Sequence, residues 1–327
     1  MIQRRKKFRD RRVQNCMIKT ILFLFLTTSL LVTGSAAPQN GLPTRIVHKP
    51  SGITLVLIPA GQFRMGSPEN ELDRGSGERQ HTRIIRKPFY MGETEVTVEQ
   101  FRRFVNATKY LTDAERGTEE GGHHKGAFAT VADGERDWSE VANWQNPYPN
   151  FKEYCLGDNH PVVQVSWNDA KRFVDHFGLQ LPTEAQWEYA MRAGTTTRFF
   201  WGDSEADGKG YGNIKDLASK KRFSRWVQSF PFDDGSTFVN VAGSYKANPW
   251  KLHDMVGNVQ EWCLDAYARE YPADGSDESA VENGTGRVMR GGSWFDAPDA
   301  QRSAKRFAFA PQGRRDFIGF RVVMRVP

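Results

Sequence analysis

Residues 198–250 place the strongest constraint on how this 327-residue chain can fold. The stretch is rich in Gly, Asp, Asn, Ser and aromatic residues and shows no sustained period of apolar positions. Residues 110–159 form a second long excursion of this kind, and the chain has no internal repeat. Buried backbone N–H and C=O groups need partners, so side chains, waters or ions must satisfy those of an ordered loop. We therefore expect one domain in which long irregular segments are held by side chains.

Regular elements are predicted at a few places only. The β-branched run Ser51–Pro59 predicts a strand that ends at its proline. Three short helices are predicted where a Ser or Thr can cap a helix and a Gln or Asp follows three residues later. The pairs are Thr97 with Gln100, Ser166 with Asp169, and Thr183 with Gln186. The third helix is expected to stop at Gly194.

The formal charge of +6 is concentrated at the N-terminus. Residues 1–37 hold eight Lys or Arg residues and one acid, Asp10. Subtracting these from the totals of 45 and 39 leaves 37 basic against 38 acidic residues, a net charge of −1 for residues 38–327. The domain therefore lacks the basic excess that steers proteins toward phosphates, and we expect no nucleic-acid partner.

Residues 1–37 are typical of an export signal: basic residues precede the apolar run 21–32 and the small residues Gly34–Ala37. A linker is predicted over residues 38–50 and the folded domain over residues 51–327. Met17 is an alternative start that keeps the same apolar run. We expect a periplasmic or secreted protein. The alternative is an uncleaved membrane anchor, the one membrane contact expected, although twelve apolar residues are short for a span.

Two cysteines, Cys155 and Cys263, follow the leader. Export permits disulfides, so one bridge between them is an open alternative. Two separately buried thiols are favoured, because Cys263 continues an apolar pattern with Trp262 and Leu264.

Seven motifs occur in order along the chain. They are Gly61–Gly66, Glu93–Thr97, His160–Trp167, Leu181–Ala190, Gly257–Trp262, Arg290–Trp294 and Gly319–Arg321. Together they resemble the formylglycine-generating enzyme, or sulfatase-modifying factor, family. The resemblance covers residues 51–326 and implies a single α+β domain, related to the C-type lectin fold, with much irregular structure.

Formylglycine-generating enzymes oxidise a sulfatase cysteine. The resemblance implies an active site in which two cysteines carry out this reaction and bind copper(I). Counted from Gly291, these two positions hold Asp296 and Gln301 here. Carboxylate and amide groups cannot exchange thiols, and they hold the soft copper(I) ion poorly. Cys263 belongs to a different motif and does not replace them. Copper and formylglycine generation are therefore not expected.

The resemblance also implies calcium, in a structural role that suits oxygen ligands around tight turns. One implied site consists of Asp254, the carbonyls of Gly257 and Val259, and Glu261. A second consists of Asn213, the carbonyl of Ile214, Asp234 and the carbonyl of Ser236. The second site departs from the family's pattern, because a longer and more basic stretch separates Ile214 from Asp234. The alternative for the first is that Asp254 and Glu261 only cap loop amides.

Candidate site residues beside the two replaced cysteines border the groove that the resemblance implies. They are Ser293, Trp294, Asp296, Gln301, Arg302 and Arg306. Ser293 and Asp296 could orient a polar ligand, and the arginines could bind a carboxylate or phosphate. The alternative for Arg290 and Arg306 is internal ion pairing. Ser293 lacks the Gly-x-Ser-x-Gly elbow of a hydrolase, and no His/carboxylate pattern predicts a catalytic metal.

These observations predict an exported domain that binds, or binds and modifies, a peptide or small polar molecule without copper–thiol oxidation. Whether the chain is an enzyme stays open. Three alternatives remain: an oxidoreductase like the periplasmic family members that act in pyoverdine maturation, a non-catalytic lectin-like binding module, and a true sulfatase-activating oxidase.

Overall fold

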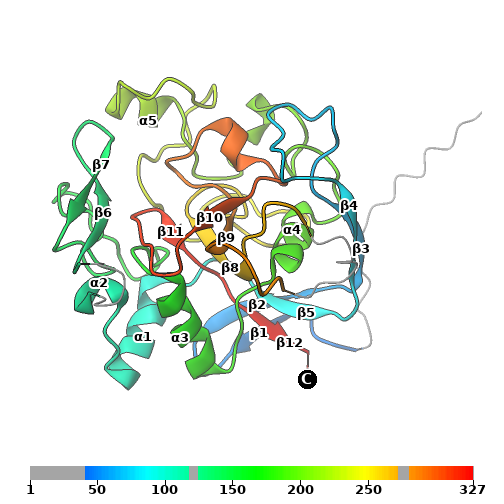
Figure 1. Cartoon of the computed structure of the whole chain (residues 1–327), viewed down its shortest axis with the longest axis horizontal. Coiled ribbons are helices and arrows are strands. Elements are labelled where there is room, and N and C mark those ends of the chain that lie inside the picture. Colours follow the sequence, from blue (N-terminus) through cyan, green and yellow to red (C-terminus); the bar gives the residue numbers. More distant parts are fainter. Residues whose placement is uncertain (1–40, 118–123, 272–279, 327) are drawn as a thin grey trace, which may run out of the picture. The chain divides into compact units, whose positions relative to one another are not determined.

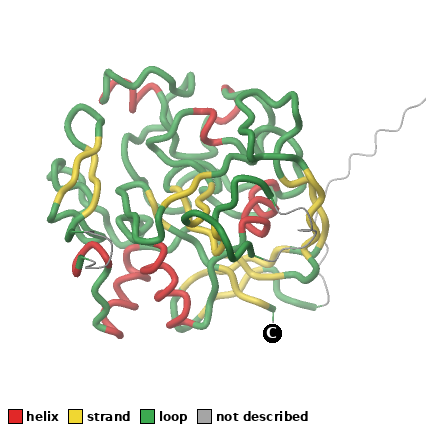
Figure 2. Tube along the Cα trace, viewed as in Figure 1, coloured by secondary structure: helices red, strands yellow, loops and turns green. Residues whose placement is uncertain are grey.

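In the part of the chain that the structure describes, two four-stranded sheets and five α-helices, three of them longer than two turns, frame a domain that consists largely of loops (Figures 1 and 2). The computed structural model describes residues 41–117, 124–271 and 280–326. The predicted leader and the first residues of the predicted linker lie outside these ranges. No helix in the described ranges is long and apolar enough to cross a membrane.

The first sheet joins the two ends of the domain. Its strands lie in the order β1-β2-β5-β12, and every pair is antiparallel. Met91 of β5 pairs with Val56 of β2 on one side and with Val323 of β12 on the other. The bounds are β1 Arg45–His48, β2 Ile53–Ile58, β5 Phe89–Gly92 and β12 Val323–Arg325. The prediction of a linker over residues 38–50 is wrong at Arg45–His48, because β1 pairs along its length with β2.

The second sheet carries the C-terminal motifs and has the order β10-β9-β8-β11. β11 runs parallel to β8, so Ile318 and Gly319 lie beside Gln260 and Glu261. The bounds are β8 Gln260–Ala266, β9 Arg287–Arg290, β10 Phe307–Phe309 and β11 Ile318–Gly319. Two separate ribbons pair β3 Gly61–Met65 with β4 His81–Ile85, and β6 Ala127–Thr130 with β7 Arg136–Ser139.

The three predicted caps are confirmed. Thr97, Ser166 and Thr183 each accept a hydrogen bond from the backbone amide three residues on, and each capping box is complete. The helix of the third cap ends at Arg192 with a left-handed Ala193, one residue before the predicted stop at Gly194. The helices are α1 Val98–Thr108, α2 Asp113–Arg116, α3 Trp167–Phe177, α4 Glu184–Arg192, α5 Leu217–Arg222, η1 Ala206–Gly208 and η2 Pro298–Gln301.

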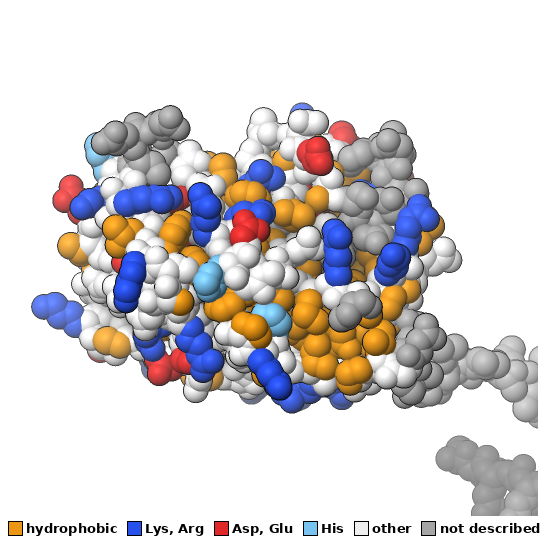
Figure 3. Space-filling model, turned by 90° about the horizontal axis from the view of Figure 1, so that it is seen from below, with side chains coloured by type: hydrophobic (Ala, Val, Ile, Leu, Met, Phe, Trp, Pro, Cys, Tyr) orange, Lys and Arg blue, Asp and Glu red, His pale blue; other side chains and the backbone are white. Residues whose placement is uncertain are grey.

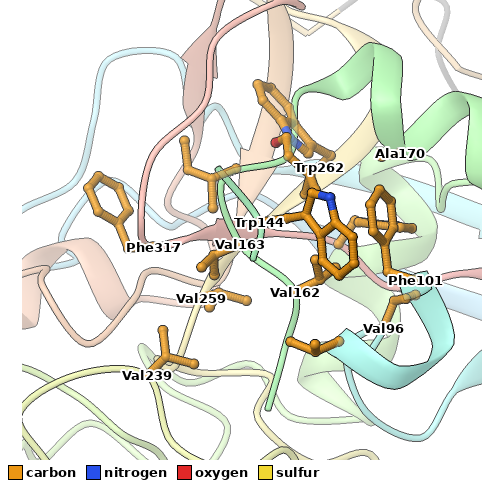
Figure 4. Packing of buried hydrophobic residues seen from close by; sticks show 14 of the residues in the cluster. Val96, Phe101, Trp144, Val162, Val163, Ala170, Val239, Val259, Trp262 and Phe317 are labelled. Carbon is orange, nitrogen blue, oxygen red and sulfur yellow. The ribbon is translucent and has the colours of Figure 1, made fainter. Parts of the chain in front are cut away.

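In the main core, α1 and α3 pack against β8 and against the loop that holds Val162 and Val163 (Figure 4). The Phe101 ring of α1 meets Trp144 edge-on at a centroid distance of 5.4 Å. Trp262 of β8 is fully buried in the same cluster, where its indole N–H donates to the Val165 carbonyl. A second cluster packs α4 against β2, β5 and β8. On the face seen in Figure 3, basic side chains are dispersed among exposed apolar ones.

The segment 198–250 is held by side-chain bonds to its backbone, as predicted. Asn248 accepts hydrogen bonds from the amides of Trp250 and Leu252 and donates to the Ala190 carbonyl. Asn258 accepts from the amide of Asn240 at 2.9 Å. The excursion 110–159 is more regular than predicted, because it contains α2 and the β6–β7 ribbon.

The two cysteines are free, so no bridge joins them. Cys263 is buried in β8, as favoured by its apolar pattern. The expectation that Cys155 is also buried is wrong: it lies in an exposed loop, where its thiol faces the Lys152 carbonyl at 3.9 Å.

Ser166→Ala should destabilise the fold more than the matched cap variant Thr97→Ala. Both lose a cap, worth about 1 kcal/mol. The Ser166 hydroxyl also donates to a carboxylate oxygen of the buried Asp113 at 2.6 Å, and loss of a buried partner costs about 1–3 kcal/mol more. Urea unfolding midpoints at unchanged slope measure the difference. Equal losses for the two variants would contradict this role.

Candidate functional site

The candidate site lies on the loop that follows β9. Gly291 and Gly292 have φ angles of 96° and 69°, a left-handed region that side chains rarely adopt. A Cβ at Gly292 would lie 2.3 Å from the Gln301 amide oxygen. Two glycines therefore let the loop turn back on itself and bring η2 against its beginning.

Asp296 is the centre of this loop. Its Oδ2 accepts a hydrogen bond from the Ser293 hydroxyl at 2.6 Å and from the Gln260 side-chain amide at 2.8 Å. No described residue donates to Oδ1, and the Asp296 side chain is half-buried. We call Ser293, Asp296 and Gln260 the Asp296 site. It presents one fixed carboxylate with one free acceptor oxygen.

The pKa of the Asp296 carboxyl is raised above its usual range, mainly because burial removes water from the charged form. The hydrogen bonds from Ser293 and Gln260 oppose this rise, as do the nearby cations Arg136 and Lys215. A carboxylate with a raised pKa and one unpartnered oxygen can accept a hydrogen bond, or a proton, from a bound molecule.

Gln301 fastens the loop and does not face a ligand. Its amide donates to the carbonyls of Ser293 at 2.7 Å and Asp296 at 3.2 Å. Its oxygen is buried beside Gly292 and has no hydrogen-bond partner within the described part of the chain. Asp296 and Gln301 are thus adjacent, as the cysteine positions of the resemblance require, but only Asp296 is available to a ligand.

The other groove candidates lie elsewhere. Trp294 is fully buried in the main core. Arg306 binds Glu184 through two hydrogen bonds of 2.7 and 2.8 Å. Arg302 binds Glu78 in the same way, and Arg290 pairs with Glu188. The prediction that Trp294 and Arg306 border a binding groove is wrong, and the alternative of internal ion pairs is the correct one for Arg290 and Arg306.

The donors around Asp296 do not fit copper(I). The described side-chain donors of the loop are a hydroxyl, a carboxylate and amides, which are hard ligands. Cys263 is buried in the neighbouring strand, where its backbone carbonyl accepts from Trp167. Burial raises the pKa of its thiol well above the usual value, which disfavours the thiolate that a soft metal needs.

At the first implied calcium site, Asp254 keeps an unpartnered carboxylate oxygen, whereas Glu261 forms an ion pair. Asp254 is buried with a φ of 54°; its Oδ2 accepts from the Gly243 amide, and its Oδ1 has no partner among the described residues. Glu261 instead binds Arg321 through two hydrogen bonds of 2.6 and 2.7 Å and accepts from the Trp187 indole at 2.8 Å. Its charge is therefore compensated within the protein.

Glu95, which the sequence did not single out, stands near Asp254. Its Oε1 accepts from Asn258 at 3.0 Å, while its Oε2 is buried and unpartnered in the described structure. Burial raises the pKa of Glu95 well above its usual value, and the Asp254 carboxylate adds to the rise. Two buried carboxylates with unpartnered oxygens need a proton or a cation, so these residues fit an oxygen-ligated ion at Asp254.

The residues of the second implied calcium site are brought together. Asp234 accepts from the amides of Ile214 at 2.7 Å and Ser236 at 2.9 Å. Burial raises the pKa of Asp234 to about 7. The side-chain oxygen of Asn213 is buried and unpartnered in the ranges that the structure covers. In those ranges no three or more His, Cys, Asp or Glu side chains form a metal-binding group, so any ion here would rely on carbonyls.

Comparisons with known proteins agree with the motifs. A family model described as the sulfatase-modifying factor enzyme 1-like domain matches residues 44–326. A formylglycine-generating enzyme of Streptomyces coelicolor is 34% identical over 284 residues, which cover 81% of this chain and 87% of that protein. A protein of Bos taurus named inactive C-alpha-formylglycine-generating enzyme 2 is 30% identical, covering 82% of this chain and 87% of its own length. The structure of PvdO from Pseudomonas aeruginosa superposes with a TM-score of 0.66 at 27% identity, covering 86% and 98% of the two chains.

Wild type and Asp296→Asn should diverge in stability as the pH rises. Unfolded aspartate titrates near about 3.9. Because burial raises the pKa of folded Asp296, the folded state binds more protons between the two values, and its unfolding free energy falls as the pH rises through them. The Asn variant lacks this loss, so its relative stability should grow upward from about pH 4.

Urea unfolding at a series of pH values measures this difference. Gln260→Leu serves as the directional control, since removing one donor to the carboxylate should raise the pKa of Asp296 further and shift the loss to higher pH. A difference between wild type and Asp296→Asn that does not change with pH would contradict the assignment.

Proposed function

The chain belongs to the sulfatase-modifying factor enzyme 1-like family, and on that premise we propose that it is an exported binding protein for a polar ligand. The ligand is a peptide or small molecule that donates a hydrogen bond to Asp296. Copper–thiol oxidation is not part of this function. Export rests on the signal pattern of residues 1–37 and on no structural observation.

One observation carries the proposal: Oδ1 of Asp296 accepts no hydrogen bond from any described residue. Two hydrogen-bond donors, Ser293 and Gln260, orient the carboxylate through its other oxygen, Oδ2. A carboxylate held in this way is pre-organised to accept a donor from a ligand without reorientation. By resemblance, the position is also that of a reactive cysteine, so the ligand would occupy the place where relatives carry out chemistry.

An oxidoreductase of different chemistry, of the pyoverdine-maturation type, is the second candidate. The raised pKa of Asp296 favours it, because such a carboxyl can act as a general base. The Bos taurus relative is named an inactive enzyme, so proteins similar to this chain carry names of both active and inactive enzymes. A lectin-like binding module without catalysis is therefore a third candidate.

A ligand screen on the full-length protein tests the proposal. Thermal shifts against a panel of short peptides and polar small molecules should yield stabilising ligands whose effect is lost in Asp296→Ala. Asp299→Asn is the matched control, because this carboxylate lies on the adjacent η2 and contacts Lys305 at 3.6 Å. Ligands that stabilise Asp296→Ala as well as wild type would contradict the site.

The same preparation discriminates the alternatives. Copper with a Cys-x-Pro-x-Arg peptide should cause no oxygen uptake, since the soft ligands are missing from residues 296 and 301. Copper-dependent uptake would instead support the sulfatase-activating oxidase. Turnover of a stabilising ligand, detected as a mass change that Asp296→Asn abolishes, would favour the oxidoreductase over the binding module.

We also propose calcium as a structural ion. Asp254 and Glu95 supply free carboxylate oxygens, with Asn213 and Asp234 at the neighbouring loop. The amide of Asn258 donates to the Asn213 carbonyl at 2.7 Å, so the two loops are tied together. A bound ion would stabilise these loops by compensating buried negative charge, a role outside any chemistry at Asp296.

Calcium added to chelator-treated protein should therefore raise the melting temperature by about 5 °C at saturation. Asp254→Ala should remove most of this shift. Asp265→Asn provides a control: Asp265 is equally buried, but its two oxygens accept from the amides of Glu184 and Val281. A calcium shift that survives in Asp254→Ala, or that magnesium reproduces, would exclude the site.

A further inference from the structure

Three basic side chains surround the rings of Phe295, Phe317 and Trp226 next to the Asp296 site. They are Arg136, Lys215 and Arg315, and we call the six residues the cation–aromatic cluster. We propose that this cluster binds an oxyanion, a carboxylate or a phosphate, carried by the ligand of Asp296. The inference rests on the proposed function and adds the chemical class of its ligand.

The cluster is defined by ring contacts. The rings of Phe295 and Phe317 stack at 5.4 Å with an interplanar angle of 10°. The Arg136 guanidinium lies 4.0 Å from the Phe295 centroid and 4.9 Å from that of Phe317. Lys215 lies 4.8 Å from the Trp226 ring and 5.9 Å from that of Phe295, and Arg315 lies 6.0 Å from that of Phe317. Shared rings therefore place three positive charges in one neighbourhood.

Distant parts of the chain build this neighbourhood. Arg136 lies on β7, Lys215 precedes α5, Arg315 precedes β11, and Phe295 follows β9. In Figure 1 the β6–β7 ribbon, α5 and β11 all lie in the left half of the domain, consistent with these contacts. Four separate segments thus converge on a charged surface that no single motif contains.

The three cations lack the partners that the other arginines of this domain have. Arg290, Arg302, Arg306 and Arg321 each bind a glutamate. Within the described residues, no carboxylate lies in ion-pair distance of Arg136, Lys215 or Arg315, and no hydrogen bond satisfies their side-chain donors. All three are half-buried, so their charges are partly desolvated without an ion-paired or hydrogen-bonded carboxylate among the described residues, which is unfavourable.

Electrostatics supports the same conclusion. Burial lowers the pKa of each of the three groups, and Arg136 lowers the pKa of both Lys215 and Arg315 because like charges repel. Asp296 opposes these shifts in all three, so it is the carboxylate that they share. An added anion would relieve the repulsion among the cations.

The geometry suits an oxyanion in particular. A guanidinium that lies over a ring keeps its N–H edges free, and these edges match the two oxygens of a carboxylate or phosphate. Three cations face the one carboxylate that they share, Asp296, so the neighbourhood remains positive and a bare anion can bind there. Oδ1 of Asp296 would add a contact by accepting a hydrogen bond from a donor on the same molecule. The expected ligand therefore joins an anionic group to a hydroxyl or amine.

Binding of aromatic probes to the full-length protein, followed by calorimetry, tests the inference. Phenyl phosphate and benzoate carry the two anions, and benzylamine is the charge-reversed control. Wild type should bind at least one anion and not benzylamine, and added salt should weaken binding. Binding of phenyl phosphate alone identifies a phosphate ligand, and binding of benzoate alone identifies a carboxylate ligand; either supports the inference.

Arg136→Gln, Lys215→Gln and Arg315→Gln should each weaken anion binding by about tenfold, the loss expected for one charge-assisted contact. Arg287→Gln is the matched control, because this half-exposed arginine lies 3.9 Å from the Trp167 ring outside the cluster. It should change affinity by less than about twofold. Circular dichroism confirms folding, and the salt dependence of wild type tests the idea without any variant.

No anion binding by wild type, or equal weakening by Arg287→Gln, would overturn the inference. The outcomes for the proposed function at Asp296 are independent of those for the anion site. If panel ligands require Asp296 but anions do not bind, only the oxyanion class is wrong. If anions bind through the three cations and no ligand requires Asp296, the cluster stands and the Asp296 function falls.

Discussion

The buried ion pair between Glu261 and Arg321 holds the domain together. Both side chains are fully buried, and Arg321 also donates to the carbonyls of Gly92 at 3.1 Å and His253 at 2.9 Å. The indole N–H of Trp187, on α4, also donates a hydrogen bond to the Glu261 carboxylate. A buried pair is tolerated only when its remaining donors and acceptors are satisfied, and here they link β8, β5, α4 and the C-terminal segment. Loops without a hydrogen-bonded ladder can therefore keep one arrangement around this centre.

The candidate site depends on the same strand. Successive side chains of a strand point to opposite faces, so Gln260 and Glu261 at the start of β8 serve different purposes. Glu261 faces the Arg321 centre, whereas Gln260 reaches Asp296. The frame can thus stay constant while the residues of the loop after β9 change. This separation explains how a chain can keep the family's fold and carry Asp296 and Gln301 where the resemblance places cysteines.

Local signals were predictable, and long-range partners were not. The capping boxes at Thr97, Ser166 and Thr183 could be predicted because both halves lie three residues apart. The Ser293–Asp296 contact was predictable for the same reason. Glu261 was assigned to calcium from the resemblance, and its ion pair with Arg321 could not be predicted because the two residues are 60 positions apart in sequence. Position next to Asp296 likewise suggested a groove for Arg306, whose true partner Glu184 lies 122 residues away.

The cation–aromatic cluster shows the same limit, since its charges come from three segments that share no motif. The strand β1 was missed because it has only four residues, of which Arg45 and Val47 are exposed, so it shows little apolar pattern. Competition for copper(I) against a chelator such as bicinchoninate tests most directly whether the replaced pair has changed the chemistry of the site. Wild type should leave the copper with the chelator, and the double variant Asp296→Cys plus Gln301→Cys should remove about one equivalent per chain. Stoichiometric copper(I) uptake by wild type would contradict the assignment of a hard, carboxylate-centred site.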